Sequence, residues 1–216
     1  MIVAAHQPNF LPNLAFFNKM RLVDLFVIVT NLQFEKQEGW QRRHKIKGPN
    51  GDIWLTVPVL GSQNQLIKDV AINNQVNWRK KHKRTIETIY AKGKGREHIP
   101  KIASLYQKEW MRLIDLNIAA ILLFKEILGI KTPLVVDEEV SGNKHQLLIN
   151  VCKKYGADTY LSGVGAKTYL DRNRMKELAA NNIKHKFVEK NLTAQYPYSC
   201  VHYLFWEGRD WVLNVI

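Results

Sequence analysis

Residues 6–12 (HQPNFLP) form the stretch of this chain that is best suited to chemistry. They follow a short apolar run over residues 2–5, which predicts a buried strand that ends in a polar turn. Ligands of open α/β sheets bind at the carboxyl ends of such strands, where an imidazole or an amide can hydrogen-bond a phosphate or polarise an oxygen atom. We therefore expect His6 and Asn9 to be catalytic and Gln7 to bind substrate.

The spacing of this turn is similar to that of the His-x-Gly-His turn of the nucleotidyltransferase superfamily, which stabilises phosphates during transfer. Pro8 stands at the glycine position and Asn9 at the position of the second histidine. The comparison is an analogy between short motifs. The alternative interpretation is that His6 and Asn9 only satisfy a tight turn.

A second turn, Tyr160 to Lys167 (YLSGVGAK), follows another predicted strand. Its glycines let backbone amides approach an anion, Ser162 adds a hydroxyl group and Lys167 adds a positive charge. It lacks the phosphate-binding loop pattern and the full dinucleotide fingerprint, so a plain tight turn is the alternative. If both strands are parallel and central, this turn and the His6 turn meet at one edge of the sheet. We expect Ser162, Gly163 and Lys167 to bind substrate.

Basic and aromatic residues interleave over residues 33–47, a pattern typical of a site that grips phosphate and stacks a flat ring. This segment includes Lys36, Trp40, Arg42 and Arg43. The candidates for substrate binding outside the two turns are Lys19, Gln33, Arg42, Arg43, Trp54 and His82.

The chain has 216 residues with 32 Lys and Arg against 19 Asp and Glu, a formal net charge of +13. Residues 79–112 hold eleven basic and three acidic residues, and this surplus of eight is more than half of the net charge. Such an excess favours an anionic partner, which is a nucleic acid, an acidic membrane surface or a diphosphate-linked sugar, whereas a solvated helix face is the alternative.

Other classes of site have little support. Cys152 and Cys200 lack metal-site spacing and are expected to be buried and apolar in character. We expect no metal site, and the sequence names no cofactor. The chain shows no secretion signal and no apolar run long enough for a bilayer span, so we expect a cytoplasmic protein that is peripheral to a membrane at most.

Alternating strand and helix patterns in the first and last thirds predict a Rossmann-like α/β fold, with a parallel sheet flanked by helices, a β-hairpin and a basic helical insertion. We expect one domain over residues 1–216, with the insertion at 79–128. The strands are expected at 2–5, 25–29, 132–136, 159–161 and 184–188. The helices are expected at 14–22, 79–91, 100–128, 144–155 (capped by Asn143) and 175–180. The hairpin arms are expected at 45–47 and 53–57.

The chain resembles the WbqC-like proteins along nearly its whole length. The resemblance lies in residues 6–12, Phe16, Phe17, Lys19, residues 24–27, Gln33, Phe34, residues 54–59, Trp78, His82, residues 158–163, Tyr169 and Leu170. It implies a role in bacterial or archaeal surface polysaccharide biosynthesis, in O-antigen gene clusters, where transfer of glycine or a similar acyl group to a sugar has been suggested. Two aspartates that are usual in the family are replaced by Thr30 and Asn31, which puts any carboxylate chemistry there in doubt.

Our first hypothesis is a transferase that moves an aminoacyl (glycine-like) or similar group to a nucleotide- or lipid-linked sugar. His6 would be a general base or phosphate ligand, and Lys19, Arg42, Arg43 and Lys167 would hold the anionic sugar-diphosphate. The alternatives are a nucleotidyltransferase-like enzyme and a non-catalytic nucleic-acid-binding protein that uses the basic face of residues 79–112. That face would equally suit an acidic membrane surface.

Overall fold

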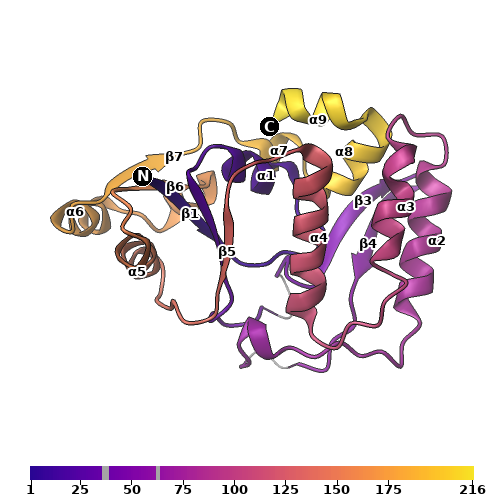
Figure 1. The fold of residues 1–216 in the computed structure, drawn as a ribbon, viewed down its shortest axis with the longest axis horizontal. Coiled ribbons are helices and arrows are strands. Elements are labelled where there is room, and N and C mark those ends of the chain that lie inside the picture. The colour runs from indigo at the N-terminus through magenta and orange to yellow at the C-terminus, as the bar shows by residue number, and fades with distance from the viewer. Residues whose placement is uncertain (36–38, 62–63) are drawn as a thin grey trace.

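Five parallel strands form the sheet that positions the functional residues (Figure 1). The computed structural model describes residues 1–35, 39–61 and 64–216, so Lys36 lies outside the described residues. The strands of this sheet are β1 (Ile2–His6), β2 (Leu25–Val29), β5 (Leu134–Asp137), β6 (Thr159–Ser162) and β7 (Lys184–Phe187). Their spatial order is β5-β2-β1-β6-β7, so the chain winds outward from β1 in one direction and then returns to add β6 on its other side. The predicted Rossmann-like α/β class is confirmed.

Helices cover both faces of the sheet because its central strands are apolar on both sides. Val3 and Ala5 of β1 pack on one face with α5, whereas Ala4 packs on the other face in the larger core that contains α1 and α4. Figure 1 shows α5 and α6 on one side of the strands and α4 on the other. The helices of these layers are α1 (Leu14–Arg21), α4 (Leu113–Leu128), α5 (His145–Tyr155) and α6 (Arg172–Ala180).

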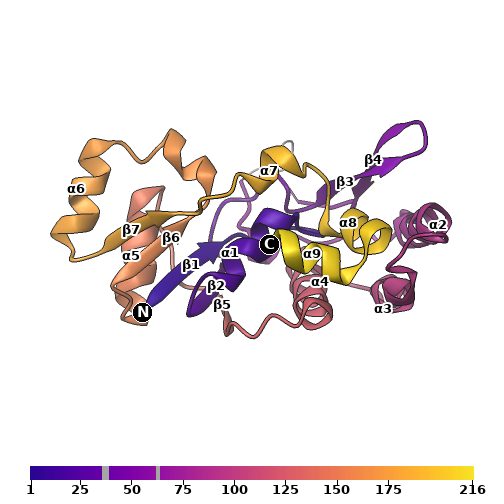
Figure 2. The same ribbon diagram turned by 90° about the horizontal axis from the view of Figure 1, so that it is seen from above.

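The remaining elements lie on the side of β1 away from α5 and α6 (Figure 2). They are β3 (Arg43–Gly48), β4 (Gly51–Thr56), α2 (Trp78–Tyr90), α3 (Ile99–Ser104), α7 (Leu192–Gln195), α8 (Cys200–Glu207) and α9 (Arg209–Val215). Among them α7 lies near the middle of the molecule beside α1, whereas α2, α3 and a separate projecting hairpin lie at its far end. Gly48 pairs with Gly51 across the predicted turn, so the hairpin is confirmed. Buried residues of α2, α3 and α4 belong to the same apolar core as α1 and α8.

The prediction of one helix over residues 100–128 is wrong. α3 ends at Ser104 and α4 begins at Leu113, because the intervening backbone pairs elsewhere. The amide of Ile72 donates to the carbonyl of Met111 at 2.8 Å, and the amide of Leu113 donates to the carbonyl of Val70 at 2.9 Å. Those groups are therefore not free for a continuous helix, although the apolar periodicity continues through them.

The predicted cap at Asn143 is also wrong. Lys144 precedes α5 with a φ of 52°, and no side chain caps the first turn. The two cysteines are buried and unpaired as predicted. Three 3-10 turns complete the described elements, at Ile67–Asp69, Arg96–His98 and Val164–Thr168.

The loop between β1 and α1 is held by three distant parts of the chain. Asn117 of α4 is fully buried, and its side-chain amide donates to the carbonyl of Pro8 at 2.8 Å and to the carbonyl of Gln41 at 2.7 Å. The hydroxyl of Ser199 donates to the carbonyl of Leu11 at 2.7 Å. Leu11 is fully buried with a φ of 45°, a strained conformation for a leucine that persists only because these contacts fix it.

We predict that Asn117→Ala destabilises the protein by about 2–4 kcal/mol, because two buried carbonyl groups lose their donor. Asn181 is the matched control, since its amide also donates to a carbonyl but at an exposed position. Asn181→Ala should cost less than about 0.5 kcal/mol. Urea unfolding of both variants measures the difference, and equal losses would show that the anchoring of the loop contributes nothing to stability.

Candidate functional site

A cleft of about 880 Å³ opens where β1 and β6 end. These neighbouring strands mark the point where the strand order reverses, which is where open α/β sheets bind ligands. The cleft brings together seven of the residues predicted from the sequence. They are His6, Gln7, Asn9, Lys19, Gln33, Ser162 and Gly163. The two turns that the sequence places 150 residues apart thus meet at one edge of the sheet.

His6 ends β1 and packs against Phe16 of α1, with ring centroids 4.9 Å apart. Its Nδ1 lies 2.9 Å from the carbonyl oxygen of Gln7. A carbonyl only accepts hydrogen bonds, so Nδ1 carries the proton and Nε2 keeps its lone pair. Burial, with the Lys19 ammonium nearby, lowers the pKa of His6 to about 3. The imidazole is therefore neutral at physiological pH and accepts a proton or a hydrogen bond through Nε2.

Lys19 reaches the same cleft from α1, although only 7% of the residue is exposed. Its Nζ donates to the carbonyl oxygen of Ala5 at 3.0 Å and lies 5.8 Å from the centroid of the Phe26 ring. No carboxylate of the described residues pairs with it. Burial lowers the pKa of Lys19 to about 7, because the charged amine has lost water without gaining a counter-ion. An anionic ligand would supply that counter-ion.

Gln7 and Asn9 have different roles in the loop between β1 and α1. The side-chain oxygen of Gln7 accepts a hydrogen bond from the fully buried Gln41 amide at 2.6 Å, so Gln7 is committed to structure. Asn9 lines the cleft, and its side chain has no hydrogen-bond partner among the described residues. Asn9 is therefore available to a ligand.

Ser162 ends β6, and its Oγ lies 2.8 Å from Nε2 of His185 on β7. His185 Nδ1 is buried without a partner. Because an unpaired buried N–H is more costly than an unpaired acceptor, we assign the proton to Nε2, which donates to Ser162 Oγ. The serine hydroxyl then has its own proton free to donate into the cleft. Tyr160 behaves similarly, since its hydroxyl accepts from the amide of Ala5 at 3.1 Å and keeps its proton for the cleft.

The glycines of the second turn are not required by the fold. Gly163 has a φ of −68°, which any residue adopts, and Gly165 is not among the residues with positive φ. A Cβ at either position would meet no atom within 4 Å. Both glycines line the cleft. Their missing side chains therefore leave room at the place where a ligand would approach the backbone.

The charge of the cleft is positive. Lys144 before α5 and Lys190 after β7 also line it, and Glu35 is the single carboxylate among its described lining residues. Sequence reasoning missed both lysines as well as Tyr160 and His185. Lys144 and Lys190 follow the carboxyl ends of β5 and β7, so strand-end position was the signal that could have identified the two lysines. That signal does not apply to Tyr160 and His185, which are the second residues of β6 and β7.

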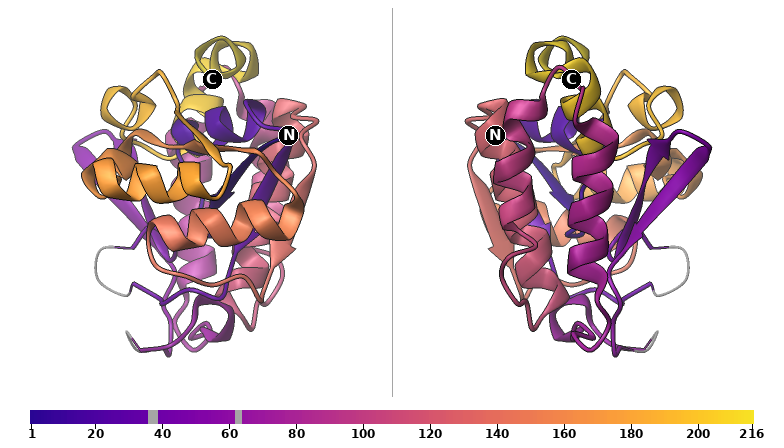
Figure 3. Two further views of the ribbon diagram at one scale, coloured as in Figure 1. Left: turned by 90° about the vertical axis from the view of Figure 1, so that its left-hand side faces the viewer. Right: turned by 90° about the vertical axis from the view of Figure 1, so that its right-hand side faces the viewer.

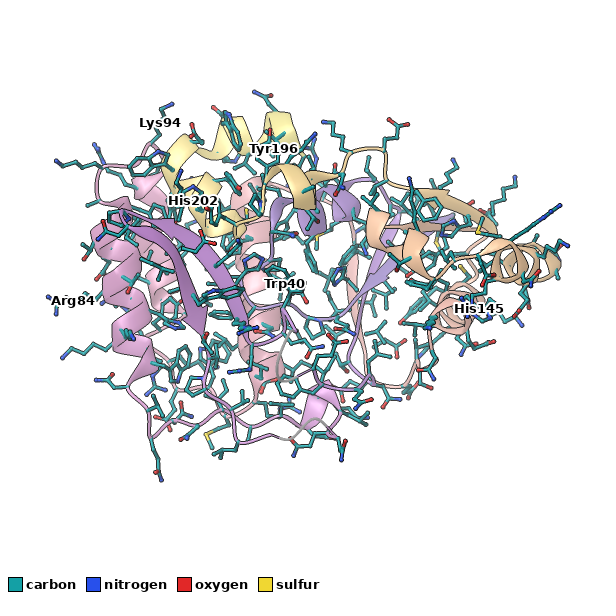
Figure 4. The ribbon with its side chains drawn as sticks, turned by 180° about the vertical axis from the view of Figure 1, so that it is seen from behind. Trp40, Arg84, Lys94, His145, Tyr196 and His202 are labelled. Carbon is teal, nitrogen blue, oxygen red and sulfur yellow. The ribbon has the colours of Figure 1, made fainter. Side chains whose placement is uncertain are left out.

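Three predicted residues lie on the hairpin side of the molecule, outside the described lining of the cleft. Arg42 precedes β3, and the guanidinium carbon of Arg43 lies 4.7 Å from the centroid of the exposed Trp54 ring. Trp40 joins this group to the cleft, because it lines the cleft and its ring centroid is 6.3 Å from that of Trp54. Figure 4 shows Trp40 between the hairpin and the five-stranded sheet.

Two further predicted residues also lie outside the described lining. Lys167 is exposed, and its Nζ lies 5.4 Å from the centroid of the Phe187 ring. His82 is buried in the core between Trp78 and Tyr106, with its ring centroid 6.0 Å from that of Phe10. It supports the far end of the His6 loop and does not face the cleft.

Thr30 and Asn31, where the family usually has aspartates, serve as connectors. The hydroxyl of Thr30 donates to the carbonyl of Asp137 at 3.2 Å, and the Asn31 amide donates to the carbonyl of Glu139 at 3.0 Å. The Asp137 carboxylate is itself saturated by Tyr155 and Lys154. Across residues 1–35, 39–61 and 64–216, no group of three or more His, Cys, Asp or Glu side chains could hold a metal ion.

The structure defines a Rossmann-like α/β protein with a candidate ligand site at the switch point of its sheet, and the described lining of that cleft carries more lysines than carboxylates. The chain belongs to the WbqC-like protein family, whose model matches residues 7–207. It is 32% identical over 186 residues to a protein of Mycobacterium tuberculosis (strain ATCC 25618 / H37Rv) named "Uncharacterized protein Rv1507c". The aligned region covers 82% of this chain and 78% of that protein. No solved structure matches the chain significantly. No helix of the described residues is long and apolar enough to cross a membrane.

We predict that Lys19→Met raises the stability at pH 6 by on the order of 3 kcal/mol, because it removes an uncompensated buried charge. Between the folded pKa of about 7 and the ordinary value of 10.5, the unfolded chain binds a proton at Lys19 that the folded chain does not. Wild-type stability should therefore rise with pH through this window, and the advantage of the variant should shrink. Thermal melts from pH 6 to pH 10 measure this, with Lys80→Met as the exposed control. Parallel pH profiles for wild type and Lys19→Met would contradict the buried-amine assignment.

Proposed function

We propose that the chain is a transferase of surface polysaccharide biosynthesis that moves an aminoacyl (glycine-like) or similar group to a nucleotide- or lipid-diphosphate-linked sugar. The single observation that carries the proposal is Lys19, a buried amine without a counter-ion at the switch point of the sheet. A diphosphate is the kind of anion that such a site selects, because it charges the amine and accepts hydrogen bonds from the neighbouring donors. Membership of the WbqC-like family supports the polysaccharide context.

In this proposal the donors that face the cleft hold the diphosphate. Lys19 and Lys190 provide positive charge, while Asn9, Ser162 and the open turn at Gly163 provide hydrogen-bond donors. The exposed indole of Trp40 at the rim provides a surface on which a ring of the substrate can stack. The site therefore combines an anion cradle with an aromatic wall, as a sugar-diphosphate requires.

His6 serves as the proton acceptor. An attacking hydroxyl or amino group of the sugar forms a bond to the acyl carbon, the bond from that carbon to its leaving group breaks, and the proton of the attacking group passes to His6 Nε2. The pKa of about 3 makes His6 a weak base in the free protein. A bound diphosphate would raise that pKa, because a nearby negative charge stabilises the imidazolium. Substrate binding thereby makes His6 a stronger base for the transfer step.

The test is a direct assay with a UDP-sugar and a glycyl donor, either glycyl-tRNA or glycine with ATP, followed by mass spectrometry of the sugar product. The proposal expects a product that is heavier by one glycyl residue, and it expects His6→Ala to abolish that product while the fold is retained. Failure of the protein to bind a UDP-sugar or pyrophosphate in calorimetry would overturn the proposal.

A nucleotidyltransferase is the second candidate, and the place of the His6 loop at the end of the first strand of the sheet favours it. Numbered along the chain, the five strands lie in the order 3-2-1-4-5, and the His6 loop follows the first of them. This candidate expects pyrophosphate release from a nucleoside triphosphate in the presence of a sugar phosphate, lost in His6→Ala. Glycyl transfer without pyrophosphate release from that pair of substrates would exclude it.

We predict that Gly163→Val weakens binding of a UDP-sugar at least tenfold and leaves the melting temperature nearly unchanged, because the new side chain fills ligand space and its Cβ meets no protein atom within 4 Å. Gly156→Val is the matched control. Gly156 has a φ of 64° and lies outside the described lining of the cleft, so this variant should cost about 1–3 kcal/mol in stability and bind normally. Unimpaired binding by Gly163→Val would show that the ligand does not use this turn.

A further inference from the structure

Three apolar side chains stand out from the surface at the end of the molecule where α2 begins. Leu60, Val76 and Met111 are 68%, 49% and 67% exposed, and Leu60 and Met111 are the most exposed large apolar residues of those described. They come from three different loops, and we call them the apolar tip. Isolated exposed side chains of this kind are common on proteins, whereas a cluster needs an explanation.

The backbone holds the apolar tip in place. The amide of Leu60 donates to the carbonyl of Ala71 at 2.9 Å, and the amide of the next residue, Ile72, donates to the carbonyl of Met111 at 2.8 Å. Leu60 and Met111 also line one shallow cavity of about 450 Å³. These hydrogen bonds fix the two segments on either side of residues 70–73, so Leu60 and Met111 flank one braced stretch of backbone.

Positive charges without ion-pair partners among the described residues lie on α2 and in the loop that precedes Met111. Lys80, Lys81 and Arg84 are exposed on α2, and Lys108 lies over the Trp110 ring at 4.4 Å. None of these four pairs with an acidic side chain of the described residues. Figure 4 shows Arg84 reaching away from α2, and the right-hand view of Figure 3 looks onto this helix.

Two of the three acidic residues close to the apolar tip are paired, whereas Asp69 is exposed and is in no ion pair of the described residues. Glu109 pairs with Arg79 at 3.2 Å, and Asp115 pairs with Arg112 at 2.8 Å. The rim of the apolar tip therefore carries a net positive charge that is available to an outside partner.

We propose that this edge docks on an anionic phospholipid bilayer, with Leu60, Val76 and Met111 entering the headgroup region while Lys80, Lys81, Arg84 and Lys108 contact lipid phosphates. An anionic bilayer binds such a surface in two ways, because the apolar side chains insert at the interface and the cations are attracted to lipid phosphates. A nucleic acid would use the cations alone and leave the apolar tip exposed. A second copy of the chain in a symmetric pair would bring the cations of both copies together.

Co-sedimentation with vesicles tests the proposal on the full chain. Vesicles of phosphatidylcholine with about one third phosphatidylglycerol should bind the protein, and pure phosphatidylcholine should bind it far less. The double variant Leu60→Ser/Met111→Ser should lower the partition coefficient about tenfold, and Lys80→Gln/Lys81→Gln should lower it about 25-fold, at about fivefold for each lysine. Leu122→Ser, at an exposed position on α4, and Lys176→Gln on α6 are the matched controls and should bind as wild type does.

Three results would overturn the proposal. Equal binding by wild type and Leu60→Ser/Met111→Ser would show that the apolar tip does not enter the membrane. Tight, salt-sensitive binding of duplex DNA or RNA without vesicle binding would assign the cations to nucleic acid. A dimer in sedimentation equilibrium that Leu60→Ser/Met111→Ser dissociates would assign the apolar tip to self-association. Circular dichroism of each variant confirms that it is folded.

Discussion

The proposed chemistry of the cleft depends on the burial of the Lys19 amine under the end of β1, where a backbone carbonyl is its only hydrogen-bond acceptor among the described residues. An uncompensated charge in such a place lowers stability, and proteins normally avoid it by pairing or by deprotonation. This chain has 19 acidic residues, and none of those described pairs with Lys19. The loss of folding stability caused by this unpaired amine therefore falls at the switch point of the sheet, where a bound anion could offset it. That coincidence links the energetics of the fold to the chemistry of the cleft.

The loop between β1 and α1, which carries Asn9 on the rim of the same cleft, is fixed by hydrogen bonds from distant parts of the chain. Ser199, which caps α8, donates to the carbonyl of Leu11, whose φ is 45°, and Asn117 of α4 donates to the carbonyl of Pro8. Buried hydrogen bonds from elsewhere in the chain thus balance the strain in the loop. Rigidity of this kind keeps Asn9 and His6 in one geometry before a ligand arrives. Donors that are already in place lose little entropy when they bind an anion, and for that reason preorganised loops make effective sites.

Much of this arrangement could be predicted from the sequence because short-range patterns control it. Three local patterns predict parallel strands and where they end, namely the apolar run of β2, the polar turn after β1 and the glycine turn after β6. The carboxyl ends of parallel strands lie at the same edge of a sheet. The hairpin followed from its turn residues in the same way. The class of fold and the meeting of the two turns were therefore accessible.

The rest depends on partners that are distant in sequence. The break between α3 and α4 arises because Met111 and Leu113 pair with residues 70–72, and no local pattern encodes that pairing. His82 carries the composition of a binding residue but packs in the core against Phe10, and Lys167 points away over Phe187. Lys144 and Lys190 enter the cleft from segments whose direction is set only by the completed sheet.

Proton exchange on binding tests the central claim most directly. Pyrophosphate is titrated into the protein at pH 8 by calorimetry in two buffers with different ionisation enthalpies, which reveals how many protons the complex takes up. Lys19, with a pKa of about 7, is mostly neutral at that pH, and a bound anion should restore its charge. The account predicts uptake that approaches one proton in wild type and none in Lys19→Met. Binding of pyrophosphate to the wild type without proton uptake would contradict it.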